Sequence, residues 1–134
     1  MKMDQKFRIF LIEDDSLVVH LYERTFTLNG FDVEVAYDGV EGLDKLSKSE
    51  ELPAVIILDL MLPKMTGFDV LRELKKNPKT KSIPVIVLSN LAQTNDIDET
   101  LKLGAAMHLV KSQHDPEDLV KKIKEVISVK ESAS

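Results

Sequence analysis

The sequence predicts an α/β fold in which a doubly wound parallel sheet is covered by helices on both faces. Short apolar runs alternate with helical patterns five times, without an internal repeat or low-complexity segment between them. Three of these runs are almost wholly apolar, as in parallel strands buried on both faces. Five units are too few to close an eight-stranded barrel, and right-handed crossovers place helices on both sides of an open sheet.

Each predicted strand is a short apolar run, and each predicted helix carries apolar residues at helical spacing. The strands are expected at residues 7–12, 32–36, 54–58, 84–88 and 107–110. The helices are expected at residues 16–28, 39–47, 67–76, 95–103 and 116–129. Asn29 and Gly30 end the first helix, while Asp115 and Pro116 begin the last as a cap followed by a first-turn proline.

Length and composition indicate a single domain. A chain of 134 residues, 43% hydrophobic and 31% charged, can bury a core of its own over residues 1–129, which leaves a short polar tail at 130–134 and no output domain in this chain. The absence of cysteine excludes disulfides and thiolate ligands. A net charge of −5 disfavours direct nucleic-acid binding. Without a signal peptide or an apolar run of about 20 residues, no membrane insertion is expected, and we expect a soluble cytoplasmic protein.

Polar side chains stand where the predicted strands end. They are Glu13, Asp14 and Asp15 after the first strand, Asp59 after the third, Ser89 after the fourth and Lys111 after the fifth. Sites in open α/β sheets lie at these carboxyl ends. Clustered carboxylates raise one another's pKa unless a positive charge is present, which here is Lys111 or a divalent cation such as Mg²⁺. We interpret Asp15 as a helix cap.

Four motifs in order, FLIEDD, LDLMLPKMTG, VIVLSN and GAAMHLVK, make the chain similar to the response regulator receiver domain of two-component signalling. The resemblance extends from Phe7 to about Val129. It implies a flavodoxin-like (βα)5 three-layer sandwich with strand order 2-1-3-4-5. It also implies a signalling domain that promotes its own phosphorylation and dephosphorylation but is not a turnover enzyme.

The resemblance also implies a role for each strand-end residue. Asp59 would accept a phosphoryl group from a sensor histidine kinase or a phosphotransfer protein. Glu13, Asp14, Asp59 and the backbone carbonyl of Met61 would hold Mg²⁺, with Mn²⁺ as a substitute. Ser89 and Lys111 would contact the phosphoryl oxygens. The face formed by the fourth helix, fifth strand and fifth helix would pass the signal to a protein target or a second copy.

Glycine and proline positions fit this reading. Pro63 and Gly67 suit the loop after the third strand, where we expect a rigid and a permissive φ to shape the turn behind Asp59. Gly104 suits the end of the fourth helix.

Three positions depart from the family pattern. Ser112 replaces a proline that usually follows the lysine in a cis bond, so we expect a trans bond and a differently shaped loop. His108 stands where many members carry a tyrosine or phenylalanine that rotates inward, and is either a smaller switch or a structural imidazole. Leu91 and Met61 flank the path of the hydrolytic water, so we predict slow self-dephosphorylation.

Other classes of protein share parts of this pattern. A haloacid-dehalogenase-type phosphatase also has a strand-end aspartate, but it needs a second acid two residues on, where this chain has Met61. A flavodoxin-like electron carrier needs hydroxyl and glycine donors in the first loop, which is acidic here. A pseudo-receiver that binds partners without phosphorylation is the remaining alternative, and Ser112 is the residue that leaves it open.

Overall fold

The computed structural model describes residues 6–133, in which five strands form one parallel sheet with the order β2-β1-β3-β4-β5. The strands are β1 (Arg8–Ile12), β2 (Asp32–Ala36), β3 (Val55–Leu58), β4 (Val85–Ser89) and β5 (Met107–Val110). The helices are α1 (Ser16–Leu28), α2 (Gly39–Lys48), α3 (Gly67–Lys76), α4 (Thr94–Lys102) and α5 (Pro116–Ala133), with a short 3₁₀ helix η1 at Lys111–Gln113. The predicted doubly wound fold and strand order are confirmed.

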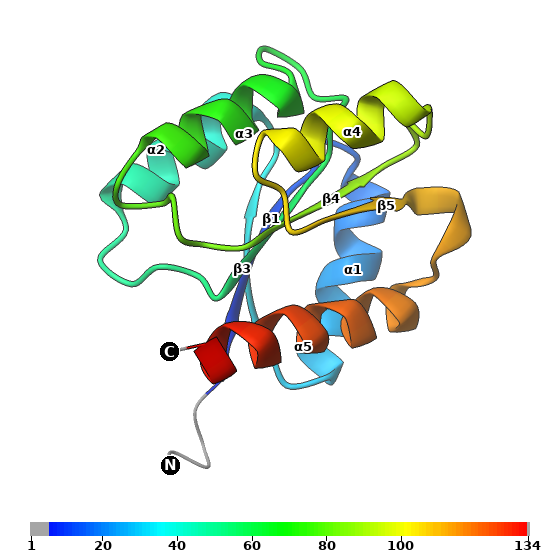
Figure 1. Ribbon diagram of the computed structural model, residues 1–134. Coiled ribbons are helices and arrows are strands. Elements are labelled where there is room, and N and C mark those ends of the chain that lie inside the picture. The colour runs from blue at the N-terminus through cyan, green and yellow to red at the C-terminus, as the bar shows by residue number, and fades with distance from the viewer. Residues whose placement is uncertain (1–5, 134) are drawn as a thin grey trace.

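Helices cover both faces of the sheet, which forms the middle of three layers. In Figure 1, α1 and α5 lie on one face, while α2, α3 and α4 lie on the other. Alternate residues of β1 serve the two sides: Ile9 and Leu11 belong to the apolar cluster under α1 and α5, whereas Phe10 and Ile12 belong to the cluster under α2 and α3. Strands buried on both sides explain the nearly continuous apolar runs in the sequence.

Local capping sets several of the element boundaries. The Asp15 carboxylate accepts hydrogen bonds from the amides of Leu17 and Val18 at 3.0 and 3.3 Å, so its interpretation as a cap of α1 is confirmed. Gly30 and Gly104 follow the ends of α1 and α4 with φ of +89° and +107°, a conformation that favours glycine. Glycine at these two positions therefore ends the helices where the sequence predicts.

The structure differs from the prediction mainly around β5 and α5. Helix α5 continues to residue 133, past the predicted end at 129, because residues 130–133 include no glycine or proline to stop it. The 3₁₀ helix η1 was not predicted. Among the described residues no peptide bond is cis, so Lys111 and Ser112 are joined by a trans bond. Helix η1 is therefore the differently shaped loop expected there.

No helix in the described part of the chain is long and apolar enough to cross a membrane. The residues that lie outside the description are 1–5 and 134.

Candidate functional site

The pairing of β1 with β3 brings two acidic residues together at the carboxyl edge of the sheet. Ile12 pairs with Leu58, so the next residues along the two strands, Glu13 and Asp59, stand side by side. The Asp59 amide donates to the Ile12 carbonyl at 3.1 Å, and the Glu13 amide donates to the Ala36 carbonyl at 3.0 Å. These backbone bonds fix the positions of both carboxylates.

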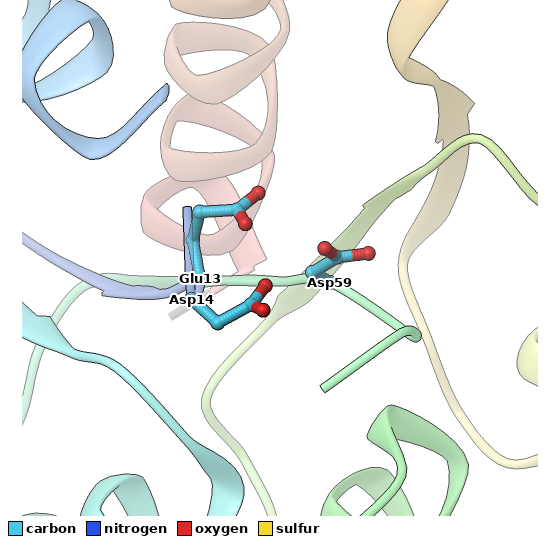
Figure 2. Close-up of side chains that lie close together, drawn as sticks. All are labelled: Glu13, Asp14 and Asp59. Carbon is cyan, nitrogen blue, oxygen red and sulfur yellow. The ribbon is translucent and has the colours of Figure 1, made fainter. Parts of the chain in front are cut away.

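Three carboxylates converge at this edge. Oxygen atoms of Glu13, Asp14 and Asp59 all lie within 4.8 Å of one another, and Figure 2 shows the three side chains close together, with Glu13 and Asp14 directed toward Asp59. Glu13 and Asp59 are 2% and 6% exposed, whereas Asp14 is open to solvent. A hard divalent cation takes oxygen ligands in such an arrangement. The donor set and its spacing therefore fit Mg²⁺ or Mn²⁺.

Lys111 supplies the positive charge next to the two buried carboxylates. Its Nζ lies 2.5 Å from Glu13 Oε1 and 3.0 Å from Asp59 Oδ2. Burial opposes the charge on this ammonium, but the bonds to Glu13 and Asp59 together raise the pKa of Lys111 above its ordinary value. Burial raises the pKa of Glu13, against the lowering effect of its hydrogen bonds from Lys111 and the Asp15 amide. The strand-end ammonium and carboxylates thus meet as the sequence analysis expects.

Backbone amides hold the remaining oxygens of the buried carboxylates. Glu13 Oε2 accepts from the Asp15 amide at 3.1 Å, and Asp59 Oδ1 accepts from the Met61 amide at 3.2 Å. Each buried carboxylate is therefore fixed by Lys111 on one oxygen and by an amide on the other. Met61 enters the site through its backbone, while its side chain is 60% exposed.

The loop behind Asp59 owes its shape to close packing at Gly67. A Cβ at Gly67 would lie 2.5 Å from the Leu60 Cα and closer still to the Asp59 carbonyl oxygen. The expectation that Gly67 supplies a permissive φ is wrong, because its φ is not positive. Lys64 instead has a φ of 70° in this loop, and its Nζ pairs with Asp38 Oδ2 at 3.3 Å. No sequence pattern indicated the close packing at Gly67 or the ion pair between Lys64 and Asp38.

Ser89 and His108 are connected to each other through Leu91. Ser89 is fully buried at the end of β4, and its hydroxyl accepts from the Leu91 amide at 3.2 Å. The ring of His108 contacts the Leu91 carbonyl at 2.9 Å and the Thr100 hydroxyl at 2.8 Å. Thr100 could not be identified from the sequence, because a threonine within a helical pattern carries no signal of a tertiary hydrogen bond.

Comparisons with known proteins indicate one family. A family model described as the response regulator receiver domain matches residues 9–124. A transcriptional regulatory protein, the CpxR homolog of Haemophilus influenzae, is 37% identical over 122 residues, which cover 90% of this chain and 50% of that protein. The DNA-binding dual master transcriptional regulator RpaA of Synechocystis is 33% identical over 120 residues, 90% of this chain and 48% of that protein.

Solved structures are similar along nearly the whole chain. A CheY-like response regulator receiver domain protein from Methanospirillum hungatei has a TM-score of 0.88 at 26% identity, with 97% of this chain and 100% of that chain covered. The receiver domain of the Francisella response regulator 1452 has a TM-score of 0.84 at 28% identity, with 93% and 99% covered. The chain spans about half the length of the two curated relatives named above. The chain belongs to the response regulator receiver domain family of two-component signalling.

Proposed function

We propose that this chain is a phosphoacceptor domain that receives a phosphoryl group on Asp59 from a sensor histidine kinase or a phosphotransfer protein. The observation that carries the proposal is the placement of Asp59. Its carboxylate is almost completely buried, lies beside Glu13 and Asp14, and is held by Lys111 at 3.0 Å. A carboxylate in this setting is oriented for nucleophilic attack.

The acidic cluster is the proposed metal site. The carboxylates of Glu13, Asp14 and Asp59 and the backbone carbonyl of Met61 would hold Mg²⁺, or Mn²⁺ in its place. When bound, the cation offsets the repulsion between the carboxylates and an incoming anionic phosphoryl group.

In the proposed transfer, an oxygen of Asp59 attacks the phosphorus of a phosphohistidine. The new P–O bond forms as the P–N bond breaks, and the electron pair stays on the histidine nitrogen. Lys111 is close enough to donate a charge-assisted bond to the transferred group, since its Nζ already contacts Asp59 Oδ2. The Ser89 hydroxyl would donate to a second phosphoryl oxygen after leaving the Leu91 amide.

The proposed output is a change in the face formed by α4, β5 and α5. This face would dock onto a protein target or a second copy of the domain, and the domain would relay a signal in the cytoplasm rather than turn over a substrate. The net charge of −5 disfavours direct nucleic-acid contact by the domain. The curated relatives named above are transcriptional regulators.

Incubation with acetyl phosphate and Mg²⁺, followed by intact mass measurement, tests the phosphoacceptor. We expect one base-labile phosphoryl adduct on the wild type and none on Asp59→Asn. Asp32→Asn, which changes an exposed carboxylate of β2, serves as the matched control and should retain the adduct. An equal adduct on Asp59→Asn would place the phosphate elsewhere. No adduct and no beryllofluoride complex on the wild type would favour the pseudo-receiver.

A further inference from the structure

The loop between β3 and α3 contains a residue with an unusual backbone conformation. Lys64 has a φ of 70°, and it is the one non-glycine residue with a positive φ among the described residues. The Met65 amide donates to the Pro63 carbonyl at 2.8 Å, which closes a three-residue turn with Lys64 at its centre. A side chain disfavours such a turn, because its Cβ crowds the neighbouring backbone. Contacts outside the turn must therefore hold Lys64 in this conformation.

The ends of the loop are fixed, so its shape depends on this turn. At one end, the Met61 amide donates to Asp59 Oδ1 at 3.2 Å. At the other end, the Gly67 amide donates to the Leu60 carbonyl at 2.9 Å. The chain between these bonds reverses direction within a fixed span, and the turn at Lys64 makes that reversal. Opening of the turn would therefore move the Met61 backbone away from Asp59.

An ion pair joins the centre of this turn to the start of helix α2. Lys64 Nζ lies 3.3 Å from Asp38 Oδ2, while Asp38 Oδ1 accepts from the Glu41 amide at 2.8 Å and caps the helix. The Asp38 side chain is only 15% exposed. The next residue, Gly39, packs against the loop, because a Cβ there would lie 3.3 Å from the Met65 Cβ. Asp38 is thus held in place and presents one carboxylate oxygen to Lys64.

We propose that Lys64 is a positioning residue for the acidic cluster, and that its ion pair with Asp38 stabilises the turn that keeps the Met61 backbone next to Asp59. Because the ion pair favours the strained φ, loss of either charge should loosen the turn. The effect on metal binding rests on the proposed function, in which the Met61 carbonyl is a ligand. The effect on the turn does not, since the ion pair and the turn are contacts of the chain alone.

Hydrogen–deuterium exchange of the Met61 and Met65 amides in metal-free protein tests the turn. We expect exchange about two- to threefold faster in Lys64→Met and in Asp38→Asn, as loss of one partly exposed ion pair predicts, and no further increase in the double variant. Asparagine is also a good helix cap, so Asp38→Asn removes the charge and keeps the cap. Lys48→Met, which breaks an exposed ion pair within α2, is the matched control and should leave both amides unchanged. Unchanged exchange in Lys64→Met would overturn the proposal.

The affinity for Mn²⁺ separates this role from a simple effect of charge. Lys64→Met removes a positive charge and Asp38→Asn removes a negative one, so charge alone would shift the affinity in opposite directions. The proposal predicts binding about two- to threefold weaker in both variants. The electron paramagnetic resonance signal of free Mn²⁺ measures this binding directly. Opposite shifts in the two variants would overturn the proposal.

Lys64→Gly tests the part played by the strained φ. Glycine adopts a positive φ without a steric penalty, so this variant should keep the turn without the ion pair and bind Mn²⁺ at least as tightly as the wild type. Asp38→Asn should have no further effect in that background. Weakened binding in Lys64→Gly, equal to that in Lys64→Met, would overturn the role of the turn. If the wild type binds no Mn²⁺, the proposed metal site fails, while the exchange results still decide whether the ion pair holds the turn.

Discussion

Substitution of Gly67 by alanine probes how closely the helix α3 start packs on the segment that carries Asp59. The added Cβ would lie 2.5 Å from the Leu60 Cα, whereas carbon atoms in contact are normally about 3.5–4.0 Å apart. The Gly67 amide also donates to the Leu60 carbonyl at 2.9 Å, which prevents the helix start from moving away freely. The backbone at Gly67 and the backbone at Leu60 must therefore move apart by about 1 Å.

The expected cost follows from two opposing effects. Forcing a methyl group into a packed site costs about 1–3 kcal/mol, and we expect the upper end because the obstructing atoms are backbone. Alanine gains up to about 1 kcal/mol over glycine inside a helix, and less at the first helical position. The free energy of unfolding of Gly67→Ala should therefore fall by about 2 kcal/mol, with reduced phosphoryl uptake because Asp59 is displaced.

Urea unfolding followed by circular dichroism measures this change, with Gly42→Ala as the matched control. At Gly42 a Cβ would lie 2.8 Å from Ile12 Cδ1, the far end of a flexible side chain that can move aside. We expect Gly42→Ala to stay within about 1 kcal/mol of the wild type. Gly67→Ala as stable as Gly42→Ala would refute the close-packing argument.

Three further predictions concern the metal site, the loop charges and the phosphate lifetime. Mg²⁺ at 100 times its dissociation constant should stabilise the wild type by about 2.7 kcal/mol, measured by thermal unfolding. The same Mg²⁺ concentration should stabilise Asp14→Asn far less. Equal stabilisation of both proteins would exclude Asp14 as a ligand. Hydrogen bonding from the Glu41 amide, with help from Lys64, lowers the pKa of Asp38, so the folded carboxylate stays charged to lower pH than the unfolded one. Asp38→Asn should thus be less stable than the wild type at pH 7 in urea unfolding. The difference should begin to shrink as pH falls below about 4 and vanish only below the lowered pKa of the folded carboxyl; a constant difference would contradict this. Leu91→Glu should shorten the lifetime of the Asp59 phosphate several-fold by admitting and orienting water, while the exposed Leu101→Glu should not; an unchanged lifetime in phosphate-release measurements would remove Leu91 from the water path.

The sequence by itself determined the elements and the residues at their ends. Apolar runs and helical spacing report how each segment is buried, which is why the strands and most helix boundaries were predictable to within a few residues. Capping by Asp15 was also predictable, because a cap is a contact between neighbours in the chain. The polar residues at the strand ends were identifiable as a group because they come directly after the apolar runs in the chain.

Contacts between distant segments were decided by the tertiary structure. Lys111 reaches both Glu13 and Asp59 because the parallel strands β1, β3 and β5 end at the same edge of one sheet, where Lys111 follows β5. The sequence suggested a positive charge near these carboxylates but not which oxygens it would contact. Strand order and register set such distances, and periodicity along one segment carries no information about either.

Gly67 and the His108–Thr100 pair are two further cases in which a contact between distant segments could not be predicted from the sequence. Glycine in a loop suggests a special φ, yet here the need is for space beside the backbone of Asp59, which becomes visible only when the loop is closed. Thr100 looked like an ordinary helical residue, and its importance comes from a ring on a neighbouring strand. The sequence gives the type of each side chain, but tertiary packing decides which side chain it contacts, because the two contacting residues lie far apart in the chain.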